Sequence, residues 1–108
     1  MRRQLLACTV LLAGLIAGPA LAQSNNPDFN LHNRGSVVIN EIYVSSSRVQ
    51  SWGNDRLGQN TLAPGRNVSI VLPANQCVND IRVVFANGQS EERRQVNTCN
   101  LTDVNFPG

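Results

Sequence analysis

The segment CVNDIRVVFANGQSEERRQVNTC, residues 77–99, carries the clearest structural signal in this chain. Apolar and polar residues alternate over residues 79–86, which predicts a strand with one face turned toward a core. Asn87-Gly88 is the pair preferred in a two-residue type I′ hairpin turn. Residues 90–96 then form the partner strand, whose charged sequence suits a solvated sheet edge. The first strand is expected to turn Ile81, Val83 and Phe85 inward and Asp80, Arg82 and Val84 outward.

Two cysteines flank the open end of this hairpin. Cys77 lies about ten residues before the turn and Cys99 about eleven residues after it, so antiparallel pairing brings the two together. We predict a Cys77–Cys99 disulfide, which the chain-entropy model values at about 3 kcal/mol. A metal site and a redox pair are weaker alternatives, because His32 is the only histidine and C-x-x-C spacing is absent. The third cysteine, Cys8, falls in a segment that we expect to be removed.

Short β-rich runs separated by turn signals occupy the rest of the chain after residue 28, and no segment has a helical period of useful length. Residues 37–45 break strict alternation, which indicates either a strand buried on both faces or a bulge near Asn40-Glu41. We therefore predict an all-β fold, a small antiparallel β-sandwich of about six to seven strands with one disulfide. The other expected strands are 29–33, 67–72 and 101–106, with a short additional one at 49–52.

The first 22 residues have the three parts of a secretion signal. Arg2-Arg3 is the positive start, residues 5–16 are a short apolar core, and Ala20-Leu21-Ala22 is a small-x-small cleavage site. The apolar core is shorter than the roughly 20 residues of a membrane span, which disfavours an uncleaved anchor. We expect a signal peptide at 1–22, a flexible N-terminal tail at 23–28 and a β-sandwich domain at 29–108, exported by a bacterium to the periplasm or beyond.

Charge excludes some classes of partner. Removal of 22 of the 108 residues leaves 86, with seven Arg, seven acidic residues and no Lys. A neutral chain without a basic patch argues against binding to nucleic acid or to anionic membranes. No complete catalytic constellation is present, and His32 has no nucleophile or carboxylate beside it in the sequence. We therefore expect neither an enzyme nor a cofactor.

The most distinctive segment is the loop Trp52-Gly53-Asn54-Asp55-Arg56-Leu57-Gly58. With several other short motifs, it resembles a family of small exported bacterial β-sandwich proteins that have a W-G-x-D-x-L-G loop and two late cysteines. The matching segments are 29–33, 39–45, 52–58, 64–65, 77–82 and Cys99. The resemblance covers nearly all of the chain after the signal. It implies the fold, but the family has no assigned activity.

This loop also supplies the candidate ligand or structural residues, which are Trp52, Gly53, Asp55 and Gly58. An aromatic ring beside a flexible glycine and a carboxylate is suited to binding a sugar or a peptide. The favoured interpretation is structural: Trp52 plugs one end of the sandwich and Asp55 caps backbone N–H groups. Calcium is disfavoured because it takes six to eight oxygen ligands and the loop offers a single carboxylate.

These features together favour a small, non-enzymatic binding or structural module of the bacterial cell envelope, whose partner is another envelope or secreted protein. One alternative is an inhibitor or modulator of a secreted hydrolase, with residues 45–60 inserted into the partner's cleft. The other alternative is a weak carbohydrate- or calcium-binding domain that uses Trp52 and Asp55. The exposure of Trp52 distinguishes these hypotheses.

Overall fold

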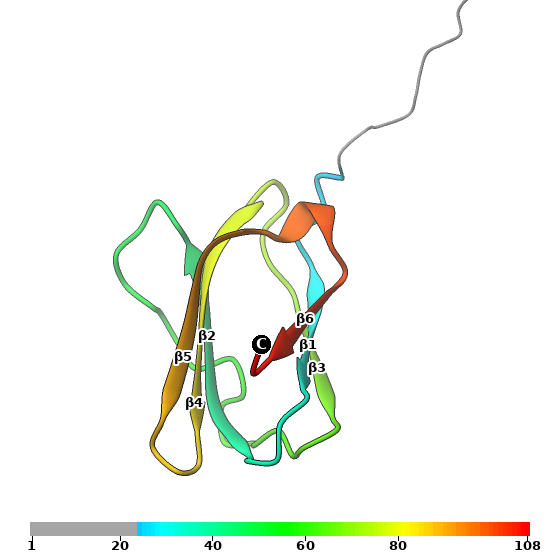
Figure 1. The fold of residues 1–108 in the computed structure, drawn as a ribbon. Coiled ribbons are helices and arrows are strands. Elements are labelled where there is room, and N and C mark those ends of the chain that lie inside the picture. Colours follow the sequence, from blue (N-terminus) through cyan, green and yellow to red (C-terminus); the bar gives the residue numbers. More distant parts are fainter. Residues whose placement is uncertain (1–23) are drawn as a thin grey trace, which may run out of the picture.

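The computed structural model describes residues 24–108, so the predicted signal peptide and its cleavage site lie outside the described residues. Six strands form two three-stranded sheets that face each other (Figure 1). The strands are β1 (Phe29–Asn33), β2 (Ile39–Ser46), β3 (Asn67–Ile70), β4 (Val78–Phe85), β5 (Ser90–Asn97) and β6 (Asp103–Phe106). The predicted all-β fold is confirmed. The additional strand predicted at 49–52 does not form, because these residues lie in an exposed loop.

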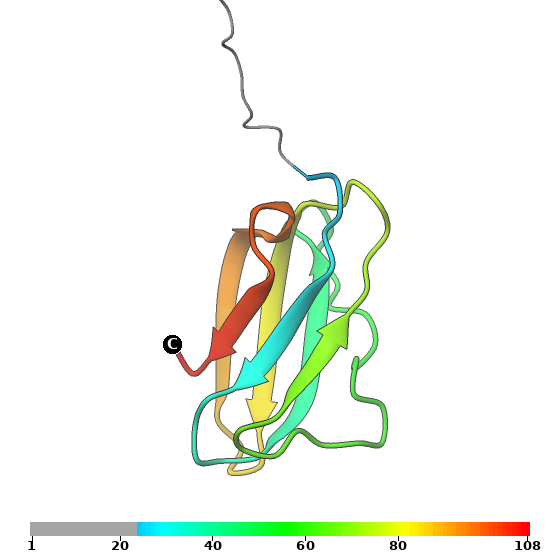
Figure 2. The same cartoon turned by 90° about the vertical axis from the view of Figure 1, so that its right-hand side faces the viewer.

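One sheet has the strand order β2-β4-β5 and is antiparallel throughout. The other has the order β3-β1-β6, in which β1 is antiparallel to β3 and parallel to β6 (Figure 2). The parallel pair is a departure from the predicted antiparallel sandwich. It arises because the chain crosses from β5 to the other sheet through the short 3₁₀ helix Thr98–Asn100 before β6 begins.

The core lies between the two sheets and contains the alternating apolar residues that the sequence pattern indicates. Ile81 and Val83 from β4 are fully buried, and Phe85 is partly buried against them. Because side chains on a strand alternate between its two faces, β1, β4 and β6 contribute every second residue to this core, whereas β5 adds only the partly buried Val96. The buried hydrophobic residues of the core are Phe29, Leu31, Ile39, Ile42, Val44, Leu57, Leu62, Ile70, Leu72, Ile81, Val83, Val104 and Phe106.

The predicted hairpin and disulfide are both present, but the predicted two-residue type I′ turn is wrong. That turn needs a positive φ at both Asn87 and Gly88, whereas Gly88 has a φ of 89° and Asn87 does not have a positive φ. The N–H of Gly88 instead donates to the C=O of Phe85 at 2.9 Å, which places Gly88 at the end of the turn.

Cys77 and Cys99 are bonded with a Cα–Cα distance of 5.0 Å. The N–H of Thr98 also donates to the C=O of Cys77 at 2.8 Å, so the bridge closes the open end of the hairpin. Closing a loop of this length restricts the unfolded chain, which is how such a bridge stabilises a small domain.

Two bulges adjust the sheet β2-β4-β5. The first shifts the register of β2 between Ile39 and Glu41, which confirms the bulge alternative for the broken alternation. The second lies in β5 opposite Asp80, where Gln95 takes a φ of 56°. A positive φ is uncommon outside glycine and fits a bulge position. This second bulge was not predicted.

The segment predicted as a flexible tail makes several contacts with the sandwich. Pro27 is fully buried, and the C=O of Asn25 accepts a hydrogen bond from the N–H of Asn75 at 3.0 Å. A carboxylate oxygen of Asp28 accepts from the N–H of Leu72 at 2.8 Å. These contacts attach residues 25–28 to the chain that follows β3.

Within residues 24–108, no helix is both long enough and apolar enough to cross a membrane. The Cys77–Cys99 bond is compatible with a protein located outside the cytoplasm, where disulfides form and persist.

Candidate functional site

The long connection between β2 and β3 holds the candidate site. Its first part, residues 47–54, projects away from the outer face of the sheet β2-β4-β5 (Figure 1). We call this part the outer arm. Its second part, residues 55–62, runs along the free edge of β2, and we call it the docked arm. The four predicted loop residues are therefore divided, with Trp52 and Gly53 on the outer arm and Asp55 and Gly58 on the docked arm.

Asp55 fixes the start of the docked arm. Its Oδ1 accepts hydrogen bonds from the N–H groups of Ile42 and Leu57, each at 2.9 Å. The N–H of Arg56 donates to the C=O of Ile42 at 2.7 Å. The Asp55 carboxylate thus caps backbone N–H groups, as the structural interpretation of the loop requires. Through these hydrogen bonds, Asp55 holds the docked arm in position beside β2.

Leu57 anchors the docked arm in the core. It is 8% exposed and packs with the residues between the two sheets. In the sequence, Leu57 belongs only to a loop motif, and no alternation around it marks it as a buried residue. Gly58 follows with a φ of 61°, and Gly53 on the outer arm has a φ of 75°. Both values lie in the left-handed region that glycine adopts without strain, so these two glycines allow the loop to reverse direction.

The outer arm begins at an anchor on β4. The Ser47 hydroxyl donates to Asp80 Oδ1 at 2.7 Å, and the Ser47 N–H donates to the C=O of Val78 at 3.1 Å. Beyond this anchor, Val49 is 51% exposed and residues 48–51 are all exposed. The outer arm is therefore fixed at its base by Ser47, and residues 48–51 beyond this base are exposed to solvent.

Trp52 does not plug the sandwich, and the favoured interpretation of this residue is wrong. Its side chain is only partly buried, and it is absent from the core. It lies instead against Arg94 of β5, whose guanidinium carbon is 4.8 Å from the ring centroid. One face of the ring is covered by this cation–π contact, which leaves less of the ring for stacking on a sugar. Trp52 is thus a surface aromatic fixed by a charged neighbour.

Asp80 connects the outer arm to β5 beneath Trp52. This carboxylate is 5% exposed, although the alternation predicted that it faces solvent. Its Oδ2 accepts from Arg94 Nη1 at 3.0 Å, and its Oδ1 accepts from the N–H of Gln95 at the second bulge, also at 3.0 Å. The hydrogen bond from the Ser47 hydroxyl, followed by those from Gln95 and Arg94, holds the pKa of Asp80 below its ordinary value. A charged Asp80 therefore fits this site better than a protonated one.

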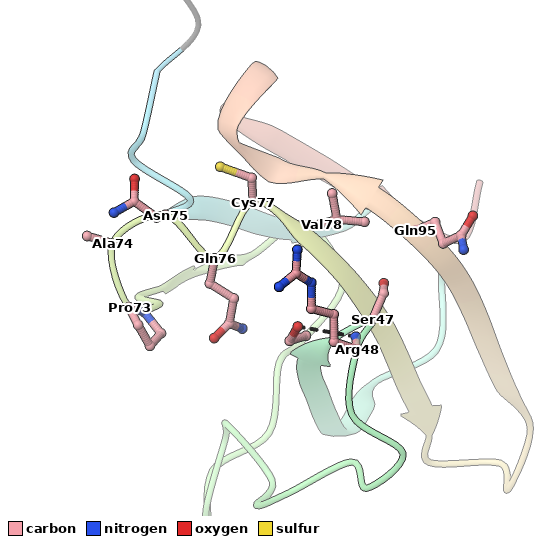
Figure 3. Close-up of a pocket in the computed structure, with 10 residues that line it drawn as sticks. Ser47, Arg48, Pro73, Ala74, Asn75, Gln76, Cys77, Val78 and Gln95 are labelled. Atoms are coloured by element: carbon pink, nitrogen blue, oxygen red, sulfur yellow. Dashed lines mark hydrogen bonds between the residues drawn. The ribbon is translucent and has the colours of Figure 1, made fainter.

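An open hollow lies at the base of the outer arm (Figure 3). It has a volume of about 780 Å³ and is walled by the chain segment 73–78 on one side and by Ser47, Arg48 and Gln95 on the other. The Arg48 guanidinium points into this hollow, near Gln76. Within residues 24–108, Arg48 forms no ion pair. Arg48 was not singled out in the sequence, since an isolated arginine in a polar loop gives no signal of its own.

A second group of polar residues lies on the outer face of the sheet β3-β1-β6. His32 Nε2 is 2.7 Å from Asp103 Oδ1, a carboxylate that lies 71 positions away in the sequence. The hydrogen bond with His32, and then that from the Thr102 hydroxyl, lowers the pKa of Asp103. No local pattern in the sequence connects this pair, because β1 meets β6 only through the parallel pairing of distant strands. The Thr102 hydroxyl donates to Asp103 Oδ2 at 2.9 Å, on the carboxylate oxygen that His32 does not contact.

Among the described residues, no three or more His, Cys, Asp or Glu side chains gather in a way that would hold a metal ion. No protein-family model, curated protein or solved structure matches this chain. The family resemblance drawn from the loop motif therefore stays a prediction.

Proposed function

We propose that this protein is an exported, non-enzymatic binding module of the bacterial cell envelope, and that the outer arm is the part that contacts its partner. The observation that carries this proposal is the position of Trp52. A tryptophan outside the core, held by Arg94 at the base of an exposed arm, contributes little to the interior of the fold. Tryptophan and arginine are also the residues most often found at the energetic centre of protein interfaces.

The rigid base of the arm supports the same proposal. Ser47 is bonded to Asp80 at one end of the arm, and Asp55 is bonded to Ile42 at the other. A loop held at both ends loses less conformational freedom when a partner binds, so more of the contact energy appears as affinity. The proposed location is the periplasm or the extracellular space, which agrees with the signal-like residues 1–22 and with the disulfide.

A capture experiment tests the proposal. The exported protein, immobilised through a C-terminal tag, is incubated with an extract of the periplasm of its own cells, and retained proteins are identified by mass spectrometry. We expect a partner that wild type retains and that Trp52→Ala does not retain. The matched control is Arg66→Ala, an exposed position at the turn before β3. Retention of the same proteins by all three forms would contradict the role of the outer arm.

The second candidate function is inhibition of a secreted hydrolase. It is favoured by one observation, the projection of the outer arm away from the sandwich (Figure 1). An inhibitor of this kind inserts such a loop into the cleft of its target. If the captured partner is a hydrolase, we expect the wild-type protein to lower its rate of substrate cleavage and Trp52→Ala to leave that rate unchanged.

A further inference from the structure

A groove of about 480 Å³ lies along the base of the outer arm. The outer arm contributes Val49 and Trp52 to its lining, and the segment after β3 contributes Pro73 and Gln76. Pro73 and Gln76 also line the hollow of Figure 3, so the groove and the hollow adjoin. We call the two together the arm groove.

The main chain of β2 beneath the arm groove is not available to an occupant. The N–H and C=O of Ile42 are bonded to the docked arm, and the C=O of Ser46 accepts from the N–H of Val49 at 3.0 Å. Val44, between them, is only 4% exposed as a whole residue. An occupant of the arm groove is therefore recognised by side chains and not by an added strand.

The charge of the arm groove has one sign. Arg48 and Arg56 are its charged lining residues, and no Asp or Glu lines it. Neither arginine is in an ion pair with a described residue, and the Arg48 guanidinium points into the hollow near Gln76 (Figure 3). The neighbouring Asp80 carboxylate is buried and already paired with Arg94. A carboxylate that enters the arm groove would therefore meet positive groups and no opposing one.

Exposed apolar side chains gather at the same place. Within residues 24–108, the large hydrophobic residues that are exposed are Val49, Val71 and Val78. Val49 and Val78 line the arm groove, and the C=O of Val71 accepts a hydrogen bond from the Arg56 guanidinium at 3.0 Å. Apolar side chains that gather on a surface and are bordered by polar residues mark sites of protein interaction, whereas scattered ones do not.

We propose that the arm groove binds an acidic surface loop of the partner protein, in which carboxylates lie next to an apolar side chain. This inference rests on the proposed binding function and specifies the chemistry of the partner. One carboxylate enters the hollow and pairs with Arg48, whose planar guanidinium can hold both carboxylate oxygens. The apolar side chain packs against Val49 and Trp52. Arginine and tryptophan together with exposed apolar groups are the composition of a protein interface.

Titration with a defined peptide, followed by NMR of the full exported protein, tests this proposal. The probe carries two aspartates around one leucine, flanked by glycine and serine, and the matched peptide has asparagine in place of both aspartates. We expect the aspartate peptide at millimolar concentration to shift the Nε–Hε signal of Arg48 and the indole N–H signal of Trp52. We expect the asparagine peptide to leave both signals in place. Equal shifts with the two peptides, or no shift with either, would overturn the proposal.

Two further titrations test other occupants of the arm groove. Sodium sulfate that reproduces the shifts of Arg48 and Trp52 would show that the hollow is a site for small anions. Shifts of the same signals when the protein is concentrated without peptide would show that a second copy covers the groove. We expect neither result, and either one would overturn the proposal of an acidic partner loop.

A pair of charge reversals carries the test to the partner itself. Arg48→Glu replaces an attraction by a repulsion, and we expect it to weaken binding of the captured partner by about fivefold to tenfold at low salt. Arg66→Glu makes the same change at a position that does not line the arm groove, and we expect it to leave binding unchanged. Equal effects of the two variants would contradict the assigned surface.

The two proposals fail in distinguishable ways. Capture that is lost in Trp52→Ala but unaffected by Arg48→Glu would overturn the acidic loop and leave the proposed function standing. Capture of the same proteins by wild type and Trp52→Ala would overturn the proposed function of the outer arm, whatever the peptide does.

Discussion

The two arms of the connection between β2 and β3 are neighbours in sequence but opposite in environment. The docked arm buries Leu57 in the core and gives backbone hydrogen bonds to β2. The outer arm is anchored at Ser47, exposes Val49, and contributes no residue to the core. Asp55 separates the two arms, since its carboxylate fixes the chain at the point where burial begins. A single loop motif therefore contains both a part that packs in the core and a part that lies outside it.

The largest expected effect comes from the docked arm. Leu57→Ala removes a buried side chain and leaves a cavity, so we expect the free energy of unfolding to fall by about 3 kcal/mol. Val49→Ala is the matched change on the outer arm, and we expect it to alter stability by less than about 0.5 kcal/mol. Urea unfolding followed by circular dichroism measures both. Similar losses in the two variants would remove the distinction between the arms.

The next effect concerns the boundary between the arms. Asp55→Ala leaves the N–H groups of Ile42 and Leu57 without their acceptor, and we expect a loss of about 2 kcal/mol. Hydrogen exchange of the Ile42 amide should also become faster. Asn54→Ala, at the neighbouring exposed position, serves as the control and should change neither quantity. Unchanged exchange at Ile42 in Asp55→Ala would show that the cap does not hold the docked arm.

A smaller effect concerns the anchor of the outer arm and depends on pH. The pKa of Asp80 is lowered in the folded protein, so the ionised carboxylate stabilises the fold. This contribution is fully present above the ordinary pKa of 3.8 and is lost as the pH falls through the folded value. We expect Asp80→Asn to lower stability by about 1.5 kcal/mol at pH 7 and to flatten the dependence of stability on pH below about 4. Parallel pH curves for the two proteins would contradict this.

Ser47→Ala sharpens the same test without a change of charge. It removes the hydroxyl that contributes most to the low pKa of Asp80. We therefore expect the pKa of Asp80, measured by carboxyl NMR, to rise toward 3.8 in the variant. An unchanged pKa would mean that the outer arm is not anchored through this hydrogen bond.

Local patterns in the sequence predicted those parts of the fold that local chemistry controls. The hairpin followed from its alternation and from Asn87-Gly88, and the disulfide followed from the cysteines at its open end. The bulge in β2 followed from broken alternation. The strand ends shifted by a few residues because ends depend on pairing, as at Leu72, which is buried beyond the last residue of β3.

The missed features depend on contacts between distant residues. The parallel pairing of β1 with β6 joins His32 and Asp103, which no local pattern connects. The burial of Asp80 depends on a bulge at Gln95 that carries no glycine to mark it. Trp52 was misplaced because a single tryptophan in a small β domain is usually interior, and only the position of Arg94 shows why this one lies outside.

The measurement that tests the central claim most directly is a comparison of Trp52→Ala with wild type in stability and in partner capture. The ring loses its contact with Arg94 and leaves no core cavity, so we expect the free energy of unfolding to fall by only about 1 kcal/mol while the captured partner is lost. Trp52 is the only tryptophan, and its fluorescence in the native protein should be quenched by acrylamide. A loss of about 3–5 kcal/mol, as for a buried aromatic ring, or retained capture by the folded variant, would contradict the account.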